Sequence, residues 1–475
     1  MSNETPQFKQ SLGLVDGTLI VIGSMIGSGI FIVSADITRN VGSAGWLLLV
    51  WLITGFMTIT AAVSYGELSG MFPKAGGQYV YLKEAYNPFV AFLYGWSFFA
   101  VIQTATAAAV AIAFSKFTAY LIPAVSEDNI LLSIGNFGIS GAQLLGIGVL
   151  LLLTWVNTRG IQEGKVIQRV FTATKLISLF GLIIAGLLAI KSDVWQANWG
   201  GNTWALGKGE TGADGAWKIL PYAGMGAILG AIATSMVGSV FSSDAWNNVT
   251  FIAGEMKNPS RNIGLSLFLG TLTVTIIYVL ANVMYTGVLP LGQIAGAEKD
   301  RVAVSAAKEI FGHAGTYVIA IMIMISTFGC VNGLLLAGAR VYYTMAQDGL
   351  FFKPAAQLNA QAVPQWALWA QFVVAAGLSL SGRYGDLLDM ISFVVVLFYV
   401  LTILGIFILR KKAPEHPRPY KAFGYPVLPF IYVLMGLAFC GLLLVYKPNY
   451  TWPGFIIVAI GIPLYVLAKR SFAGR

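Results

Sequence analysis

Charged residues are scarce in this sequence: they make up 10% of its 475 residues, against about 25% in an ordinary soluble domain. Cysteine and histidine are rarer still, with two of each. Cys330 and Cys440 both lie in apolar runs, which excludes a secreted disulfide-stabilised scaffold. His313 and His416 are far apart and have no cysteine nearby, so neither a metal cluster nor an activated nucleophile is expected. With 57% hydrophobic residues, the chain belongs in a lipid bilayer.

Long apolar runs take the place of the missing charge. A chain can cross lipid only as helices or as a closed barrel, because every backbone amide must be satisfied within the protein. Barrel strands would appear as short alternating segments, whereas these runs are long enough for helices, which need about 20 residues to cross. We therefore predict an all-α integral membrane protein with 12 transmembrane helices. The expected spans are residues 14–38, 44–69, 88–122, 140–158, 167–190, 221–255, 262–288, 315–342, 364–382, 385–409, 426–446 and 453–469.

Basic residues in the connections predict the orientation. If both termini are cytoplasmic, 18 lysines and arginines fall on the inner side and nine on the outer side. This bias supports cytoplasmic termini by the positive-inside rule. The net charge of +9 then reflects membrane topology and contact with lipid headgroups, and no nucleic-acid partner is expected. Residues 1–13 are polar and lack a cleavage site, so we expect the first span to be retained.

The first span is rich in small residues near its centre. Between Gly23 and Gly29 it contains three glycines and two serines. A glycine in a helix interior costs up to about 1 kcal/mol relative to alanine, and a cluster of glycines allows the helix to unwind. Close helix packing is the simpler alternative, because Gly23 and Gly27 have the spacing of a GxxxG contact.

The sixth span contains polar residues where a passive lipid anchor would have none. Ser242, Ser243 and Asp244 are followed closely by Asn247 and Asn248. Such residues at membrane depth are expensive unless they face a cavity or a partner. Asp244 could instead cap a second half-helix, but a cap inside a span also requires that the span is interrupted. Both explanations predict a break in this helix.

Two lysines fall within predicted spans. Lys175 lies about eight residues inside the fifth span, too deep to reach the surface comfortably. We expect its ammonium to face the protein interior and to bond to backbone carbonyls freed by a break. Lys116 lies seven residues before Pro123, near the outer end of its span, so we expect it to extend toward the outer surface.

The two interrupted spans predict an inverted repeat of five plus five helices, because an odd number of helices turns the second copy upside down. Unwound helices at matching places in two halves point to the binding site of a transporter. Their free N–H groups suit a carboxylate and their free carbonyls suit an ammonium, so a zwitterion fits both. The predicted units are a cytoplasmic N-terminus 1–13, a first repeat 14–190, an outer loop 191–220, a second repeat 221–410, a cytoplasmic loop 411–425, and helices 11 and 12 with the C-terminus in 426–475.

Several short motifs follow one another in a specific order. They are GSMIGSGIF (23–31), GELS (66–69), FPKAGGQYVY (72–81), FLYGW (92–96), Lys175, FSSDAWN (241–247), GEMKNP (254–259), and Asn332-Gly333 leading to ARVY (339–342). With these motifs the chain resembles the L-type amino acid transporter family, including its bacterial exchangers, within the amino acid–polyamine–organocation superfamily. The resemblance covers nearly the whole chain.

The resemblance implies roles for the residues at the two breaks. The amides at Ser28 and Gly29 would bind the substrate carboxylate, and carbonyls at Met25, Phe241 and Asp244 would bind its amino group. Phe241 would also act as an outer gate. The candidate substrate-binding residues are Met25, Ile26, Gly27, Ser28, Gly29, Phe241, Ser242 and Asp244. The candidate coupling residues are Lys175 and Asn332.

The resemblance also implies that Lys175 replaces a sodium ion found in related sodium-coupled carriers. Segment 75–86 would be a cytoplasmic re-entrant loop. Ser243 and Ala245 depart from the family pattern, which has an aromatic residue or alanine and then glycine, so the preferred side chain stays open. Mammalian members join a heavy chain through a cysteine after helix three. Residues 123–139 contain no cysteine, so no disulfide-linked heavy chain is expected.

These features lead us to expect a sodium-independent exchanger of neutral L-amino acids that works by alternating access. It would lie in the plasma membrane, the inner membrane of a bacterium, and we expect no cofactor, no metal and no enzymatic activity. Proton-coupled uptake of neutral or cationic amino acids is an alternative, with Lys175 or Asp244 titrating. A sensor that binds amino acids without transporting them is a further alternative, although signalling proteins usually carry an additional soluble domain.

Overall fold

The computed structural model describes residues 12–74, 76–134, 137–159, 161–381 and 384–473. The longer helices are α1 (Leu14–Met25), α2 (Ser34–Val41), α3 (Ala44–Met71), α4 (Gln78–Ala85), α5 (Pro88–Ser97), α6 (Gln103–Leu121), α7 (Gly141–Arg159), α8 (Ile161–Leu188), α9 (Ser192–Trp199), α10 (Gly224–Ser242), α12 (Pro259–Val288), α14 (Val302–Gln347), α15 (Gln365–Ser381), α16 (Tyr384–Lys412), α17 (Val427–Tyr446) and α18 (Pro448–Ala473). The shorter elements are η1 (Gly29–Phe31), η2 (Phe98–Ile102), η3 (Pro123–Val125), α11 (Asn248–Phe251), η4 (Ala253–Glu255), α13 (Leu291–Ala295), η5 (Glu298–Asp300), η6 (Lys353–Ala356), and the strands β1 (Ile130–Ile134), β2 (Phe137–Ser140), β3 (Gly207–Thr211) and β4 (Trp217–Pro221).

The molecule is a helical membrane protein, as predicted. Within the described ranges, ten helical segments are long and apolar enough to cross a bilayer. The first predicted span is not among them because it is divided into α1, with 12 residues, and α2, with eight. The ninth is the 17-residue helix α15. The total of twelve crossings therefore stays a prediction, whereas the helical fold is confirmed.

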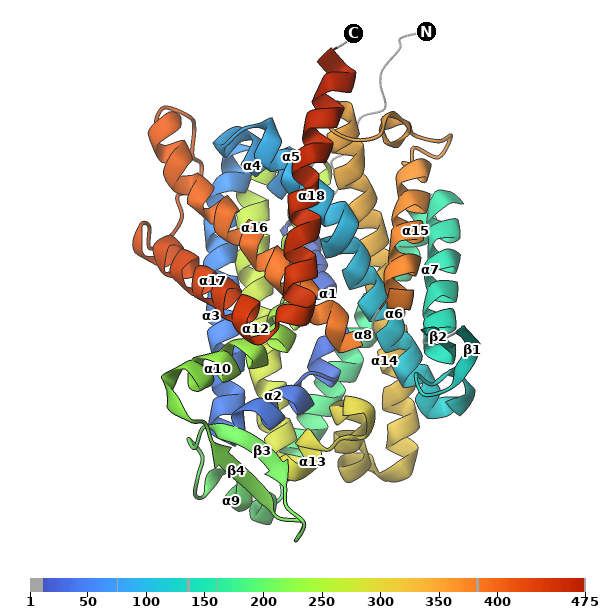
Figure 1. Cartoon of the computed structure of the whole chain (residues 1–475), viewed down its shortest axis with the longest axis vertical. Helices are drawn as coiled ribbons and strands as arrows, with labels where there is room; N and C mark the ends of the chain where they lie inside the picture. Colours follow the sequence, from blue (N-terminus) through green and yellow to red (C-terminus); the bar gives the residue numbers. More distant parts are fainter. Residues whose placement is uncertain (1–11, 75, 135–136, 160, 382–383, 474–475) are drawn as a thin grey trace.

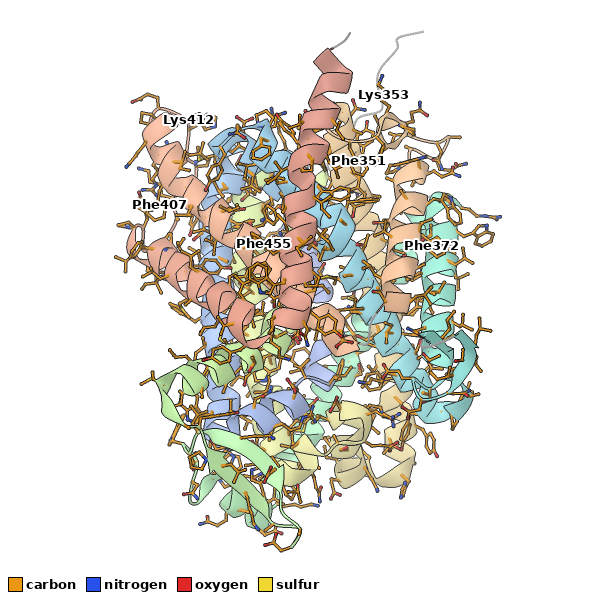
Figure 2. All side chains as sticks on the ribbon, viewed as in Figure 1. Phe351, Lys353, Phe372, Phe407, Lys412 and Phe455 are labelled. Atoms are coloured by element: carbon orange, nitrogen blue, oxygen red, sulfur yellow. The ribbon has the colours of Figure 1, made fainter. Side chains whose placement is uncertain are left out.

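The ends of the bundle define two faces. The beginning of α1 and the end of α18 lie on one face, which we call the terminal face (Figure 1). Helices α2, α9 and α13 and both β-hairpins lie at the opposite end, which we call the distal face (Figure 1). Lys353 and Lys412 both lie on the terminal face, among the basic residues that the charge pattern assigns to the cytoplasm (Figure 2).

The largest error in the predicted boundaries concerns α14. This helix begins at Val302 rather than at residue 315 and runs for 46 residues. Gly312 interrupts its helical geometry, with φ 70° and ψ −167°, so a short distal helix and a long spanning helix are joined end to end. Lys308 and Glu309 make the distal part too polar to be recognised as a continuation of the span.

Two antiparallel hairpins on the distal face were not predicted. Strand β1 pairs with β2, and β3 pairs with β4. The second hairpin includes the glycine-rich segment that starts at Gly207, within the predicted outer loop 191–220. The indole of Trp217 donates to the carbonyl of Gly42 at 2.7 Å, which ties this hairpin to the end of α2.

A buried carboxylate joins α3 to the terminal end of α16. Glu67 is 1% exposed and accepts two hydrogen bonds from Arg410, at 3.0 and 2.7 Å. Arg418 lies 3.4 Å from the same carboxylate, and the amide of Ala422 donates to it at 2.8 Å. Because every oxygen of this buried charge is engaged, the network fixes the connection after α16 against the bundle.

We expect replacement of Glu67 by Gln to destabilise the folded protein by about 3–5 kcal/mol, because the partly buried Arg410 and Arg418 would lose the counter-charge that they share. Thermal unfolding in detergent should show a clearly lowered midpoint. The matched control is Glu309→Gln, which breaks a half-exposed pair with Lys191 and should leave the midpoint almost unchanged. Equal midpoints for the two variants would show that the network contributes nothing to stability.

Candidate functional site

The first span is interrupted in the interior of the protein. Helix α1 ends at Met25, the next three residues are not helical, and the chain continues through η1 into α2. Ser28 and Gly29 are fully enclosed. Within the described ranges, the backbone amides of Gly27, Ser28 and Gly29 donate to no acceptor. Buried amides without a partner are costly, so this break holds donors that are available to a ligand.

The sixth span is interrupted beside the first. Helix α10 ends at Ser242 and α11 begins at Asn248, with Ala245 between them at a positive φ of 62°. A Cβ atom at Gly29 would overlap the hydroxyl of Ser242, so the two breaks are in direct contact. Glycine is required at position 29 by this close approach. The interruptions predicted in both spans are thus present and adjacent.

A tyrosine from a third helix joins the two breaks. The hydroxyl of Tyr278, on α12, lies 2.9 Å from the carbonyl of Met25 and 2.9 Å from the carbonyl of Ser242. Both carbonyls stand at helix ends, where the backbone lacks intrahelical donors. Sequence reasoning missed Tyr278, because a single tyrosine within an apolar span gives no sign of its partners.

Lys175 satisfies the carbonyls that the first break frees. It is 0% exposed, and its ammonium donates to the carbonyls of Gly23 at 2.6 Å and Ile26 at 3.0 Å. Because α1 ends at Met25, neither carbonyl receives the amide bond that a continuous helix would supply. The expected contact between this lysine and freed carbonyls is therefore present.

The other candidate coupling residue, Asn332, lies on α14 and is buried. Its side-chain carbonyl accepts a hydrogen bond of 2.9 Å from the amide of Asn157 on α7. Within the described residues these two side chains connect the fourth and eighth spans. Asn157 was not singled out from the sequence.

Asp244 does not cap the second half-helix. The cap position of α11 is Asn247, and it makes no side-chain cap bond. The carboxylate of Asp244 instead accepts a hydrogen bond of 2.5 Å from Tyr399 on α16. Cavities of about 10 and 20 Å³ flank Asp244, each with room for about one water molecule. The capping interpretation was wrong because a tyrosine from a distant helix reaches this carboxylate.

Aromatic side chains close the site toward the distal face. The rings of Phe241 and Tyr384 meet edge to face, with centroids 6.0 Å apart. The hydroxyl of Tyr384 lies 3.0 Å from that of Ser28. Lys116, expected to extend to the outer surface, is instead buried, with its ammonium 5.5 Å from the centre of the Tyr384 ring. A ring face attracts a cation, which explains why this lysine turns inward.

Polar contacts close the site toward the terminal face. Glu255, in η4, forms an ion pair of 2.8 Å with Arg340 on α14. Just before α1, Leu12 accepts a hydrogen bond from the amide of Lys257 and donates one to the carbonyl of Glu255. The predicted re-entrant segment contains helix α4, which lies on the same face (Figure 1).

Two facing helix interruptions in a membrane bundle, which leave backbone amides and carbonyls without intrahelical partners, are the arrangement expected at the binding site of a transporter. The family model described as "Amino acid permease" matches residues 12–467. The chain therefore belongs to the amino acid permease family.

Individual relatives match over nearly the full chain. Human "Large neutral amino acids transporter small subunit 2" is 30% identical over 465 residues, which is 97% of this chain and 80% of the relative. Human "b(0,+)-type amino acid transporter 1" is 27% identical over 451 residues, covering 94% and 85%. Mouse "Asc-type amino acid transporter 1" is 28% identical over 471 residues, covering 98% and 82%.

We expect Tyr278→Phe to slow amino acid transport by about tenfold, because it removes the one hydroxyl proton that two buried carbonyls share and loosens the joint between the breaks. The rate of labelled amino acid uptake per folded protein measures the effect. Tyr86→Phe is the matched control, since its hydroxyl bonds to the carbonyl of Leu401 away from the breaks. Similar rates for the two variants would contradict a role for Tyr278 at the site.

Proposed function

We propose that this protein exchanges neutral L-amino acids across the plasma membrane without sodium, by alternating access at the two breaks. The substrate carboxylate would bind the amides at Ser28 and Gly29. Its ammonium would bind the carbonyls of Met25, Phe241 and Asp244. The first two carbonyls already accept one hydrogen bond each, and each retains a second lone pair for the ligand.

The position of the Lys175 ammonium carries this proposal. An unwound backbone in a membrane frees carbonyls that attract a cation, and related carriers would place a metal ion there. In this chain a covalently attached cation, bonded at 2.6 and 3.0 Å, already occupies the carbonyls of Gly23 and Ile26. A sodium ion is therefore unnecessary to hold the break open, and substrate can drive the transition by itself.

The site chemistry favours neutral amino acids. Asp244 is the candidate partner for a cationic side chain, and Tyr399 already donates to one oxygen of its carboxylate at 2.5 Å, which leaves fewer acceptor sites for such a ligand. Proton-coupled uptake is the second candidate function, because the same carboxylate lies next to two cavities that each hold about one water. The names of the relatives, which include a large neutral amino acids transporter, agree with the first candidate.

The remaining parts of the proposal concern topology and partners. Segments 14–190 and 221–410 would form the inverted repeats, with Phe241 as a gate on the distal side. The distribution of lysine and arginine supports a cytoplasmic terminal face, and we assign the membrane to a bacterial cell. The two cysteines, Cys330 and Cys440, are both buried in spanning helices, which supports a transporter without a disulfide-linked heavy chain.

The decisive experiment uses purified protein in liposomes that contain alanine, serine, leucine, arginine or buffer alone. Uptake of a labelled neutral amino acid is followed without sodium and without a pH gradient. We expect uptake only when an amino acid is present inside, and the loading series gives the selectivity. Uptake that ignores the internal amino acid but requires an inward proton gradient would replace exchange by proton coupling.

Replacing Lys175 by Met should lower exchange at least about tenfold, because the hydrophobic side chain leaves the freed carbonyls unsatisfied. Exchange rates with and without sodium measure the effect, and size-exclusion profiles in detergent establish that the variant is folded. Lys353→Met, on the terminal face, removes one exposed lysine and should exchange like the unmodified protein. Full exchange by the folded Lys175 variant would refute the proposed role of the ammonium.

A further inference from the structure

A hollow of about 280 Å³ opens at the distal face, between the end of α6 and the beginning of α14. It is more than ten times larger than either cavity at Asp244, and approaches the roughly 300 Å³ at which small-molecule sites begin. We call it the distal vestibule. It is lined by Lys116, Tyr120, Glu127, Asp128, Lys299 and Arg301, among other residues.

Most of the charges in the distal vestibule are paired with each other. Arg301 forms an ion pair with Glu298 at 2.8 Å, lies over the ring of Tyr120, and donates to the carbonyl of Lys116. Lys299 is paired with Asp128. These pairs are local and leave little free charge for a ligand.

Two groups of opposite charge lack such a partner. Lys116 is only 8% exposed, and in the described part of the chain its ammonium has no carboxylate within 4.0 Å and no hydrogen-bond acceptor. One carboxylate oxygen of Glu127 is buried and receives no hydrogen bond. A buried ammonium without a counter-charge is costly, and the buried oxygen of the half-buried Glu127 has no donor, so both groups can bind a ligand that supplies the missing contacts. A free ammonium and a free carboxylate in one hollow complement the two ends of a zwitterion.

The free lysine also lies beside the central site. Its ammonium is 5.5 Å from the ring centre of Tyr384, and the hydroxyl of that ring lies 3.0 Å from the Ser28 hydroxyl at the first break. Tyr384 also packs edge to face against Phe241, at the end of α10. A carboxylate held by Lys116 would therefore be one aromatic side chain away from the amides at Ser28 and Gly29.

We propose that the distal vestibule is a staging site for the transported amino acid, with Lys116 binding its carboxylate and Glu127 its ammonium before Tyr384 and Phe241 move aside. This inference rests on the proposed function, since it takes the same zwitterionic substrate. Uptake from the distal side would then depend on Lys116, whereas uptake from the terminal side would not. The proposal therefore predicts that loss of Lys116 changes the KM measured from the distal side only.

The test compares the two directions of transport for Lys116→Met. KM for a labelled neutral amino acid is measured from the distal side in right-side-out vesicles and from the terminal side in inside-out vesicles. We expect the distal KM to rise about tenfold with kcat within about twofold, and the terminal KM to stay the same, because a charge-assisted hydrogen bond is lost on one side only. Lys116→Arg, which keeps the charge, should restore a distal KM within about threefold of the original.

Lys308→Met is the matched control, because it removes an exposed distal lysine outside the vestibule and should change neither KM. If Lys116→Met does not fold, Glu127→Gln tests the ammonium end of the same site and should give the same sided rise. Equal rises in both directions, or no rise in a folded variant, would overturn the staging site while leaving exchange intact. Failure of the unmodified protein to transport any amino acid would instead refute the proposed function.

Discussion

The bond between the Lys175 ammonium and the carbonyls of Gly23 and Ile26 is the contact on which the interrupted first span depends. In a bilayer no water is available to satisfy a backbone that leaves its helix, so a break must find partners within the protein. A lysine supplies several donors from one side chain and remains attached to α8. The carbonyls of Gly23 and Ile26 are thereby satisfied within the protein. The amide side stays unsatisfied and is left for a ligand.

The contacts that hold the second break against the first also leave the amides of the first break unbonded, and these contacts are between neutral groups. Tyr278 bonds to a carbonyl from each break, and Ser242 fits into the space that Gly29 leaves open. None of these contacts uses the free amides at Gly27, Ser28 and Gly29. The two half-helix ends can therefore move together as one unit, while the donors that recognise a ligand remain available. In these short segments the free amides are available to bind a ligand, whereas the carbonyls and the Ser242 side chain hold the two breaks together.

The sequence was sufficient to locate the breaks, because glycine and polar residues at membrane depth stand out against apolar spans. It also placed Lys175 toward the interior, since depth alone makes any other direction expensive. The partners that close the site could not be found in this way. Tyr278 and Tyr399 are ordinary span residues and Tyr384 lies between two predicted spans, and their contacts join segments separated by more than thirty residues. A hydropathy profile gives the depth of a residue but not the side of the helix on which it lies, which is also why the direction of Lys116 was predicted wrongly.

The hairpins were missed for a simpler reason, because short strands in polar connections leave no periodic signal of their own.

The two ends of the site are closed by different chemistry, and this difference bears on alternating access. Toward the terminal face the closure consists of the pair between Glu255 and Arg340 and of backbone bonds to Leu12. Such bonds can be exchanged for bonds to water at a net cost of about 1 kcal/mol each. Toward the distal face the closure is the aromatic contact between Phe241 and Tyr384, which loses apolar burial when it opens. The Tyr384 hydroxyl lies 3.0 Å from the Ser28 hydroxyl, so the aromatic closure is in direct contact with the first break. If substrate binds at the first break as proposed, this contact would link its occupancy to the position of the aromatic closure, which is the kind of coupling that a carrier without a driving ion requires.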